Sequence, residues 1–193
     1  MGLIPPLKQL FFMKIPIELF AIFFLFFLSI NVVKAQSPFS TDAHVVHGGL
    51  GLRSYGGNFG LNTNVNSLPI LSVSYDQGII DNLGIGNLGV GAGMGIKFYS
   101  ANGLNTNWTR IFFGARGTYH FDFVNSDSFD FYAGAVAGFY FETTNNKDAY
   151  NTTSGSFGGP IAGINYWITP TFGLYGEAGF GFGFLNGGVS YQF

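Results

Sequence analysis

The stretch Gly187-Gly188-Val189-Ser190-Tyr191-Gln192-Phe193 decides which fold the sequence is expected to adopt. In an extended strand successive side chains point to opposite faces, so Val189, Tyr191 and Phe193 share one face. The intervening residues share the other face, which leaves one apolar side and one polar side. Chain ends are usually frayed and polar. An aromatic end with this alternation therefore indicates a strand that is paired along its length.

This stretch resembles the C-terminal assembly signal of bacterial outer-membrane β-barrels. In that signal apolar residues alternate, an aromatic residue stands two positions before the end, and the last residue is Phe. Here Gly188, Val189, Tyr191 and Phe193 form the corresponding barrel-closing signal. The resemblance implies that the insertion machinery of the outer membrane recognises this strand, which then closes the barrel against the first strand.

The composition favours an all-β chain. Of the 193 residues 30 are Gly and 24 are Phe, and only 9% are charged, against roughly 25% in soluble domains. Each Gly inside a helix costs about 1 kcal/mol relative to Ala, so the chain is too rich in glycine for helices and too apolar for disorder. The absence of cysteine excludes a disulfide scaffold, a thiolate metal site and a cysteine-linked lipid anchor.

The N-terminal region is typical of a secretory signal peptide. A basic residue and an apolar run precede Val33 and Ala35, which fit the −3 and −1 positions of a cleavage site. Residues 1–35 are therefore predicted to be removed before Gln36, and Met13 is the more natural start of such a signal. An uncleaved anchor is the alternative, although the run is shorter than the ~20 residues that a spanning helix needs.

Residues 36–193 are predicted to form one domain, a transmembrane antiparallel up-and-down β-barrel of eight strands. Segments of alternating polarity are separated by clusters of Asn, Gly, Ser, Asp and Thr, as in outer-membrane barrels. A spanning strand needs about 9–11 residues, so ten strands would leave almost no loops. The expected strands are 43–53, 68–76, 83–99, 108–122, 129–142, 156–169, 172–182 and 187–193.

Within these segments one face is apolar and the other carries the polar residues. In 108–122 Ile111, Phe113 and Phe121 oppose Arg110 and Arg116, and in 83–99 an apolar face opposes a row of glycines. In a membrane barrel the apolar face contacts lipid, whereas in a soluble sandwich or ligand-binding barrel it forms the core, and the phasing does not distinguish them. The final strand, the signal peptide and aromatic residues near strand ends favour the membrane barrel.

The inward charges are the candidate site. Lys97, Arg110 and Glu142 are expected to meet near the outer end, and Arg116 and Glu177 to face each other at mid-height. Unpaired charges in an interior of low dielectric are costly, so we expect a charge network that fills the lumen, with a selectivity filter as the alternative. Charge reversal at both Arg116 and Glu177 should recover the stability that either reversal alone loses. Three further residues are inward by the same phasing: His47, Arg53 and Asp76.

No catalytic, cofactor or metal site is predicted. Gly84-Ile85-Gly86-Asn87-Leu88-Gly89 matches the dinucleotide fingerprint by letter, but further glycines follow where a helix is required. A hydrolase needs a nucleophile, a base and an acid at one height, and no such set is recognised. His44 and His47 fall on opposite faces of a strand, which argues against a metal pair. The isoelectric point of about 5.8 gives no reason to expect nucleic acid as a partner.

Over residues 36–193 the sequence resembles the small outer-membrane barrels of Gram-negative bacteria, the OmpA-barrel, OmpX and porin-like families. The resemblance implies an integral protein of the bacterial outer membrane, in contact with its lipid, and no enzyme activity. Eight strands give an interior that side chains fill. The lumen is therefore expected to be plugged, and the expected role is a structural one or an interaction at the cell surface through the outer loops. The sequence does not identify the partner of these loops. The alternative is a narrow channel for small solutes or ions, favoured by the inward glycines at 89, 91, 93 and 95.

Overall fold

The computed structural model describes residues 38–52, 65–101, 106–122, 126–145 and 153–193. The predicted signal peptide, residues 1–35, and the predicted inward residue Arg53 lie outside the described residues. Among the described residues no helix is long and apolar enough to cross a membrane.

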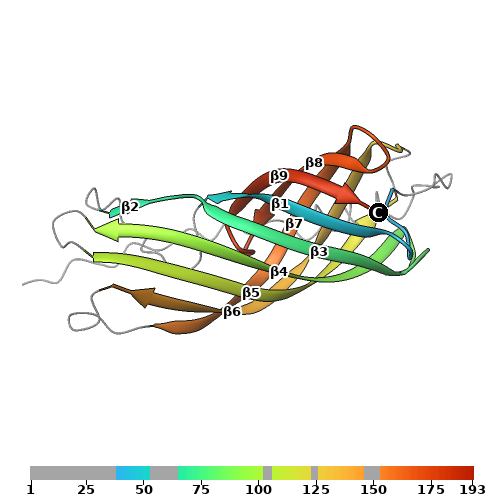
Figure 1. Cartoon of the computed structure of the whole chain (residues 1–193). Coiled ribbons are helices and arrows are strands. Elements are labelled where there is room, and N and C mark those ends of the chain that lie inside the picture. Colours follow the sequence, from blue (N-terminus) through green and yellow to red (C-terminus); the bar gives the residue numbers. More distant parts are fainter. Residues whose placement is uncertain (1–37, 53–64, 102–105, 123–125, 146–152) are drawn as a thin grey trace, which may run out of the picture. The chain divides into compact units, whose positions relative to one another are not determined.

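Nine strands are paired antiparallel into a closed ring (Figure 1). Each strand from β3 onward pairs with the next, and β9 returns to pair with β1. The short β2 pairs with the end of β4 that extends beyond β3. β2 and β3 therefore occupy one strand position of the barrel, and we call each such position a stave. The all-β fold and the eight-stranded barrel predicted from the sequence are therefore confirmed. The strands are β1 (His44–Leu52), β2 (Val65–Ser67), β3 (Ile70–Ile80), β4 (Gly86–Ala101), β5 (Thr106–Phe121), β6 (Phe129–Thr144), β7 (Ser154–Trp167), β8 (Phe172–Gly179) and β9 (Leu185–Gln192).

Several strand ends differ from the expected ones, and the clearest case is the hairpin between β8 and β9. Phe182 was expected inside a strand ending at 182, yet β8 ends at Gly179 and Phe182 lies in the connection. Gly179 has a φ of 136°, which side-chain-bearing residues rarely adopt, and the chain leaves the ladder there. The apolar alternation continues through Phe180 and Phe184, so period two alone did not reveal the turn.

The outward face of the barrel is apolar on every stave. Cross-strand neighbours such as Phe113 and Phe139, or Phe172 and Tyr191, present their side chains to the exterior. Phe139 is 64% exposed, although a soluble protein would bury such a residue. Polar side chains instead occupy the inward positions, among them His47, Asp76, Arg116, His120, Asp130, Asn165 and Glu177.

The interior is layered along the barrel axis. At the terminal end, where β1 begins and β9 ends, a buried group that we call the terminal cluster consists of Phe39, Ala43, Val45 and Trp167. Polar residues follow, and beyond them lies a second buried group, the loop-side cluster. Its members are Ile70, Phe112, Val136, Phe157, Ile161 and Phe182. Toward the loop end the interior becomes polar again around Arg110 and Glu142.

The inward glycines of β4 make room for these groups. A Cβ built on Gly89 would lie 2.8 Å from the ring of Phe39, and one built on Gly93 would lie 2.8 Å from the ring of Phe182. Neither aromatic side chain comes from a barrel strand, because Phe39 precedes β1 and Phe182 lies between β8 and β9. The glycine row is therefore a surface on which two inserted rings pack.

The barrel is taller on one side. Among the described residues, β1 is paired with β9 as far as Leu52 and with β3 as far as Gly51, whereas β4 and β5 remain paired up to Ala101 and Thr106. In Figure 1, β4, β5 and β6 accordingly extend past the end of β1. These three strands form a wall that rises at the loop end.

Candidate functional site: the barrel interior and its loop-end mouth

The centre of the interior is an arginine held by two carboxylates. The Nη2 of Arg116 on β5 lies 2.7 Å from Oε2 of Glu177 on β8, and its Nε lies 3.0 Å from Oδ1 of Asp76 on β3. Tyr132 donates a hydrogen bond of 3.0 Å to Glu177, and Arg116 donates one of 3.2 Å to the hydroxyl of Ser74. The structure thus brings Arg116 and Glu177 together across the lumen and adds Asp76 as a third member.

Two histidines extend this cluster toward the terminal end. His47 lies with Nε2 3.3 Å from Asp76 and with Nδ1 2.9 Å from the hydroxyl of Ser190. His120 lies with Nδ1 2.8 Å from Asp130. Asn165 connects the two arms, because it donates to Asp130 at 2.9 Å and accepts from Ser190 at 3.0 Å.

The sequence reasoning missed most of this polar network. The inward positions of Asp130 and His120 could be read from strand alternation, but the link through Asn165 and Ser190 joins β7 to β9 across the intervening β8. A contact between strands that are not neighbours cannot be read from the pattern of either strand.

Three side chains of the network are arranged like the hydroxyl, imidazole and carboxylate of a hydrolytic triad. The Oγ1 of Thr118 lies 3.1 Å from Nε2 of His120, whose other ring nitrogen contacts Asp130. A triad acts only if a substrate reaches its hydroxyl, and Thr118 is 0% exposed. The ring of Phe39 lies flat on His120 at 3.6 Å between ring centroids and 7° between planes. In this arrangement the three groups satisfy one another and fill space.

A second charged group lies at the loop end. Nε of Arg110 lies 2.8 Å from Oε2 of Glu142, which also accepts a hydrogen bond from the hydroxyl of Tyr99. The guanidinium of Arg110 stands 4.6 Å from the ring centre of Tyr140, a cation–π distance. Lys97 lies directly opposite Arg110 in the β4–β5 ladder. The structure therefore pairs Arg110 with Glu142 and places Lys97 beside them.

Replacing Glu142 with glutamine is expected to lower the melting temperature of the detergent-folded barrel by a few degrees. Hydrogen bonds to charged groups contribute about 1.5–3 kcal/mol when buried. The side chains of Arg110 and Glu142 are 10% and 11% exposed, so water screens a part of this interaction and we expect a loss of about 1–2 kcal/mol. Thermal unfolding followed by circular dichroism checks this. Asp127→Asn makes the same chemical change on an exposed connection and should leave the melt unchanged; equal melts for both variants would contradict the pairing.

The four residues of the barrel-closing signal lie in the seam between the last and first strands. Gly188 and Val189 stand opposite Gly49 and Gly48 on β1, and Tyr191 stands opposite Val46. The backbone N–H of Phe193 donates to the carbonyl of His44 at 3.1 Å. The side chains of Val189, Tyr191 and Phe193 share the outward face and are exposed.

The two histidines of β1 face opposite sides, because His44 lies on the outward side and His47 is buried in the interior. Nδ1 of His44 lies 2.6 Å from the hydroxyl of Tyr75, and its ring stacks against Phe193 at 5.7 Å between ring centroids. Within the described ranges no three His, Asp or Glu side chains form a group suited to a metal ion.

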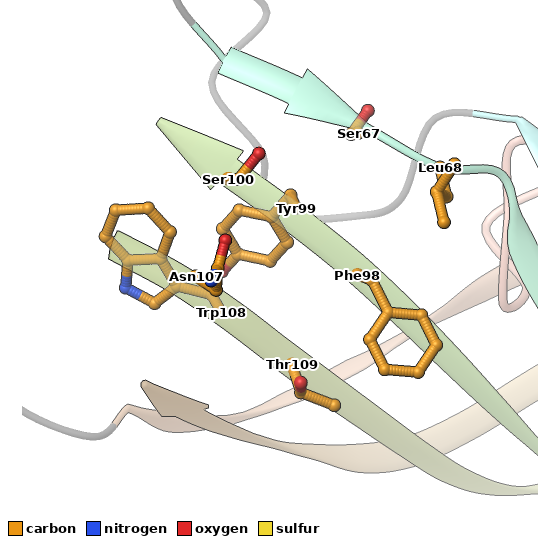
Figure 2. Close-up of a pocket in the computed structure, with 8 residues that line it drawn as sticks. All are labelled: Ser67, Leu68, Phe98, Tyr99, Ser100, Asn107, Trp108 and Thr109. Atoms are coloured by element: carbon orange, nitrogen blue, oxygen red, sulfur yellow. The ribbon is translucent and has the colours of Figure 1, made fainter. Parts of the chain in front are cut away.

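A hollow opens near the loop end of β4 and β5, where β2 joins them (Figure 2). Its volume of about 420 Å³ falls within the range of small-molecule pockets, about 300–1,000 Å³. Tyr99 and Trp108 face each other in the ladder, and their rings stack at 5.5 Å with 9° between planes. None of the described residues that line the hollow is charged. The lining residues are Ser67, Leu68, Phe98, Tyr99, Ser100, Asn107, Trp108 and Thr109.

No protein-family model matches the sequence, and no curated protein matches it. Among solved structures the chain is similar to Ail, the attachment invasion locus protein of Yersinia pestis. The identity is 13% and the TM-score 0.46, over 80% of this chain and 100% of Ail. A structure of Ail with the heparin analogue sucrose octasulfate gives the same values. The outer membrane protein OprG of Pseudomonas aeruginosa is 11% identical with a TM-score of 0.45, over 82% of this chain and 99% of OprG.

Proposed function

We propose that this chain is an integral β-barrel protein of the bacterial outer membrane. The observation that carries the proposal is the distribution of polarity: the outward face is apolar on every stave and the charged side chains of the strands are inside. This is the reverse of a soluble barrel, whose aromatic faces would have to be buried. The apolar exterior would contact lipid, and the insertion machinery would recognise the C-terminal strand with its outward Val189, Tyr191 and Phe193.

We further propose that the lumen is closed and that the protein acts at the cell surface. Support for closure comes from Phe39 and Phe182, whose rings pack on the glycine row that would otherwise line an open path. Charge pairing around Arg116 fills the space between them. Support for a surface role comes from the wall of β4, β5 and β6, which carries aromatic and charged groups beyond the level at which β1 ends.

Single-channel recording tests this proposal. Protein purified from washed membranes, and shown to be folded by a heat-dependent gel shift, is inserted into a planar bilayer. We expect no steady conductance, because apolar constrictions in a narrow pore exclude water and ions. Steady, ion-selective steps would instead establish the channel alternative, with Arg116 and Glu177 as candidate selectivity residues.

The location is tested separately by washing the membranes with carbonate. An integral barrel stays in the membrane pellet, whereas a peripheral or secreted protein is released. Release of the folded protein would overturn the membrane assignment whatever the conductance shows.

A further inference from the structure

The hollow near the loop end lies across the boundary between apolar and polar outward residues. Phe98 and Thr109 are opposite each other in the β4–β5 ladder, and Ser100 and Asn107 form the next outward pair. From Leu88 to Phe98 every outward residue of β4 is apolar, and Ser100 is the first polar one. A ligand in the hollow would therefore meet an apolar surface on one side and a polar surface on the other.

The apolar side of the hollow is exposed and continues the outward band. Leu68 is 63% exposed and Phe98 is 40% exposed. The backbone N–H of Leu68 donates to the carbonyl of Phe98 at 3.0 Å, which fixes the two residues side by side. The outward polar side offers two hydroxyls and one carboxamide, groups that both donate and accept hydrogen bonds. These belong to Ser100, Thr109 and Asn107.

The uncharged lining restricts the class of ligand. A phosphate or carboxylate in the hollow would have no cation among the lining residues, and a buried charge without a partner is costly. The rings of Tyr99 and Trp108 stack on the inward face of the same β4–β5 ladder, behind the outward pairs, and hold the two strands together there. The lining suits an uncharged ligand that has both hydroxyl groups and C–H faces, which is the chemistry of a sugar ring.

We propose that this hollow binds the uncharged saccharide headgroup of a glycolipid in the membrane leaflet at the loop end. The sugar hydroxyls pair with Ser100, Asn107 and Thr109, and the acyl chains continue along the apolar outward row that begins at Phe98 and Leu68. This inference rests on the proposed insertion of the barrel in a membrane. The continuous apolar row favours a lipid-linked sugar over a free one, because a free sugar has no acyl chain to pack against it.

Fluorescence of Trp108 provides the test. The chain has two tryptophans, so Trp167→Phe leaves Trp108, which lines the hollow, as the reporter. The protein is placed in phosphatidylcholine nanodiscs that contain increasing fractions of digalactosyl diacylglycerol. We expect a saturable change in emission with this lipid, and no saturable change with phosphatidylglycerol at the same fractions or with a soluble digalactoside.

The polar side of the hollow is then removed in the same reporter background. Ser100→Ala with Asn107→Ala should raise the half-saturating glycolipid fraction about tenfold, because two hydrogen bonds are lost. Ser154→Ala with Ser156→Ala is the matched control on β7, where both residues are outward and exposed, and should leave the titration unchanged. The heat-dependent gel shift confirms that both double variants are folded.

The outcomes separate this inference from the proposed function. Two results with inserted, folded protein overturn the inference and leave the membrane assignment standing. One is that the emission of Trp108 does not respond to the glycolipid, and the other is that both double variants give the same titration. Equal saturation by the soluble digalactoside would overturn the proposal that the bound sugar belongs to a lipid. Saturation by phosphatidylglycerol would overturn the proposal that the ligand is uncharged. Folded protein that does not enter nanodiscs overturns the proposed function and this inference together.

Discussion

Replacing Arg116 with methionine is expected to destabilise the folded barrel by about 3–5 kcal/mol, the usual effect of removing one partner from a buried ion pair. Arg116 lies within 3.0 Å of both Asp76 and Glu177, so its removal leaves two buried carboxylates without the arginine that pairs with them. For a chain of this length the loss corresponds to a fall of roughly 10 °C in melting temperature. Thermal unfolding of the detergent-folded protein, followed by circular dichroism, measures it.

Arg110→Met is the comparison for this prediction. Among the described residues Arg110 pairs with one carboxylate, Glu142, at the loop end, so its replacement should cost less than that of Arg116, which pairs with two. A triple change of Arg116→Met, Asp76→Asn and Glu177→Gln should recover part of the stability lost by the single change, because no unpaired charge then remains. Melting temperatures in which Arg116→Met equals Arg110→Met, or in which the triple variant is the least stable, would contradict the buried cluster.

The same geometry changes the expectation for reversing both charges of the mid-height pair. The double reversal recovers the stability lost by either single reversal only if Arg116 and Glu177 form an isolated pair. The structure adds Asp76 at 3.0 Å from Arg116, so a glutamate at position 116 would face another carboxylate. We therefore expect the exchanged variant to stay destabilised.

Removing both inserted rings, by Phe39→Ala with Phe182→Ala, is expected to produce conductance in a barrel that is otherwise silent. Each ring belongs to one of the two apolar clusters, and the clusters close the lumen on either side of the polar network. Either single variant keeps one closure and should remain silent. Planar-bilayer recording of the two single variants and the double variant distinguishes these states.

Stability must be controlled in this experiment, because truncating a buried Phe to Ala typically costs about 3–5 kcal/mol. Phe139→Ala is the matched control, since Phe139 is outward and its loss opens nothing inside. Each variant is recorded only after the gel shift shows folded protein, and Phe39→Leu with Phe182→Leu is recorded as a milder pair. If the alanine and the leucine double variants are both folded and silent, the charge network alone closes the lumen. If either single variant conducts, the arrangement with two closures is contradicted.

Strand alternation was enough to predict which residues face inward. From Ile111 to Phe121 of β5 and from Phe129 to Phe141 of β6 alternate residues are apolar or glycine, and the structure places those residues outside and Arg110, Arg116, Asp130 and Glu142 inside. A strand reverses its side chains with each residue, so the phase of a long segment is set by many residues at once. The length of the chain left room for eight strands, and the ring of eight staves is what the structure contains.

The sequence by itself therefore determined the fold class, the number of staves and the inward face of each strand, because these depend on local periodicity. Only the tertiary structure decided what meets inside the barrel. Asp76 joins Arg116, Asn165 joins Ser190, and the ring of Phe39 lies on His120, all between segments far apart in the sequence. Such contacts depend on the tilt and stagger of strands around the closed ring, and on where connecting segments fold inward, which no single strand encodes.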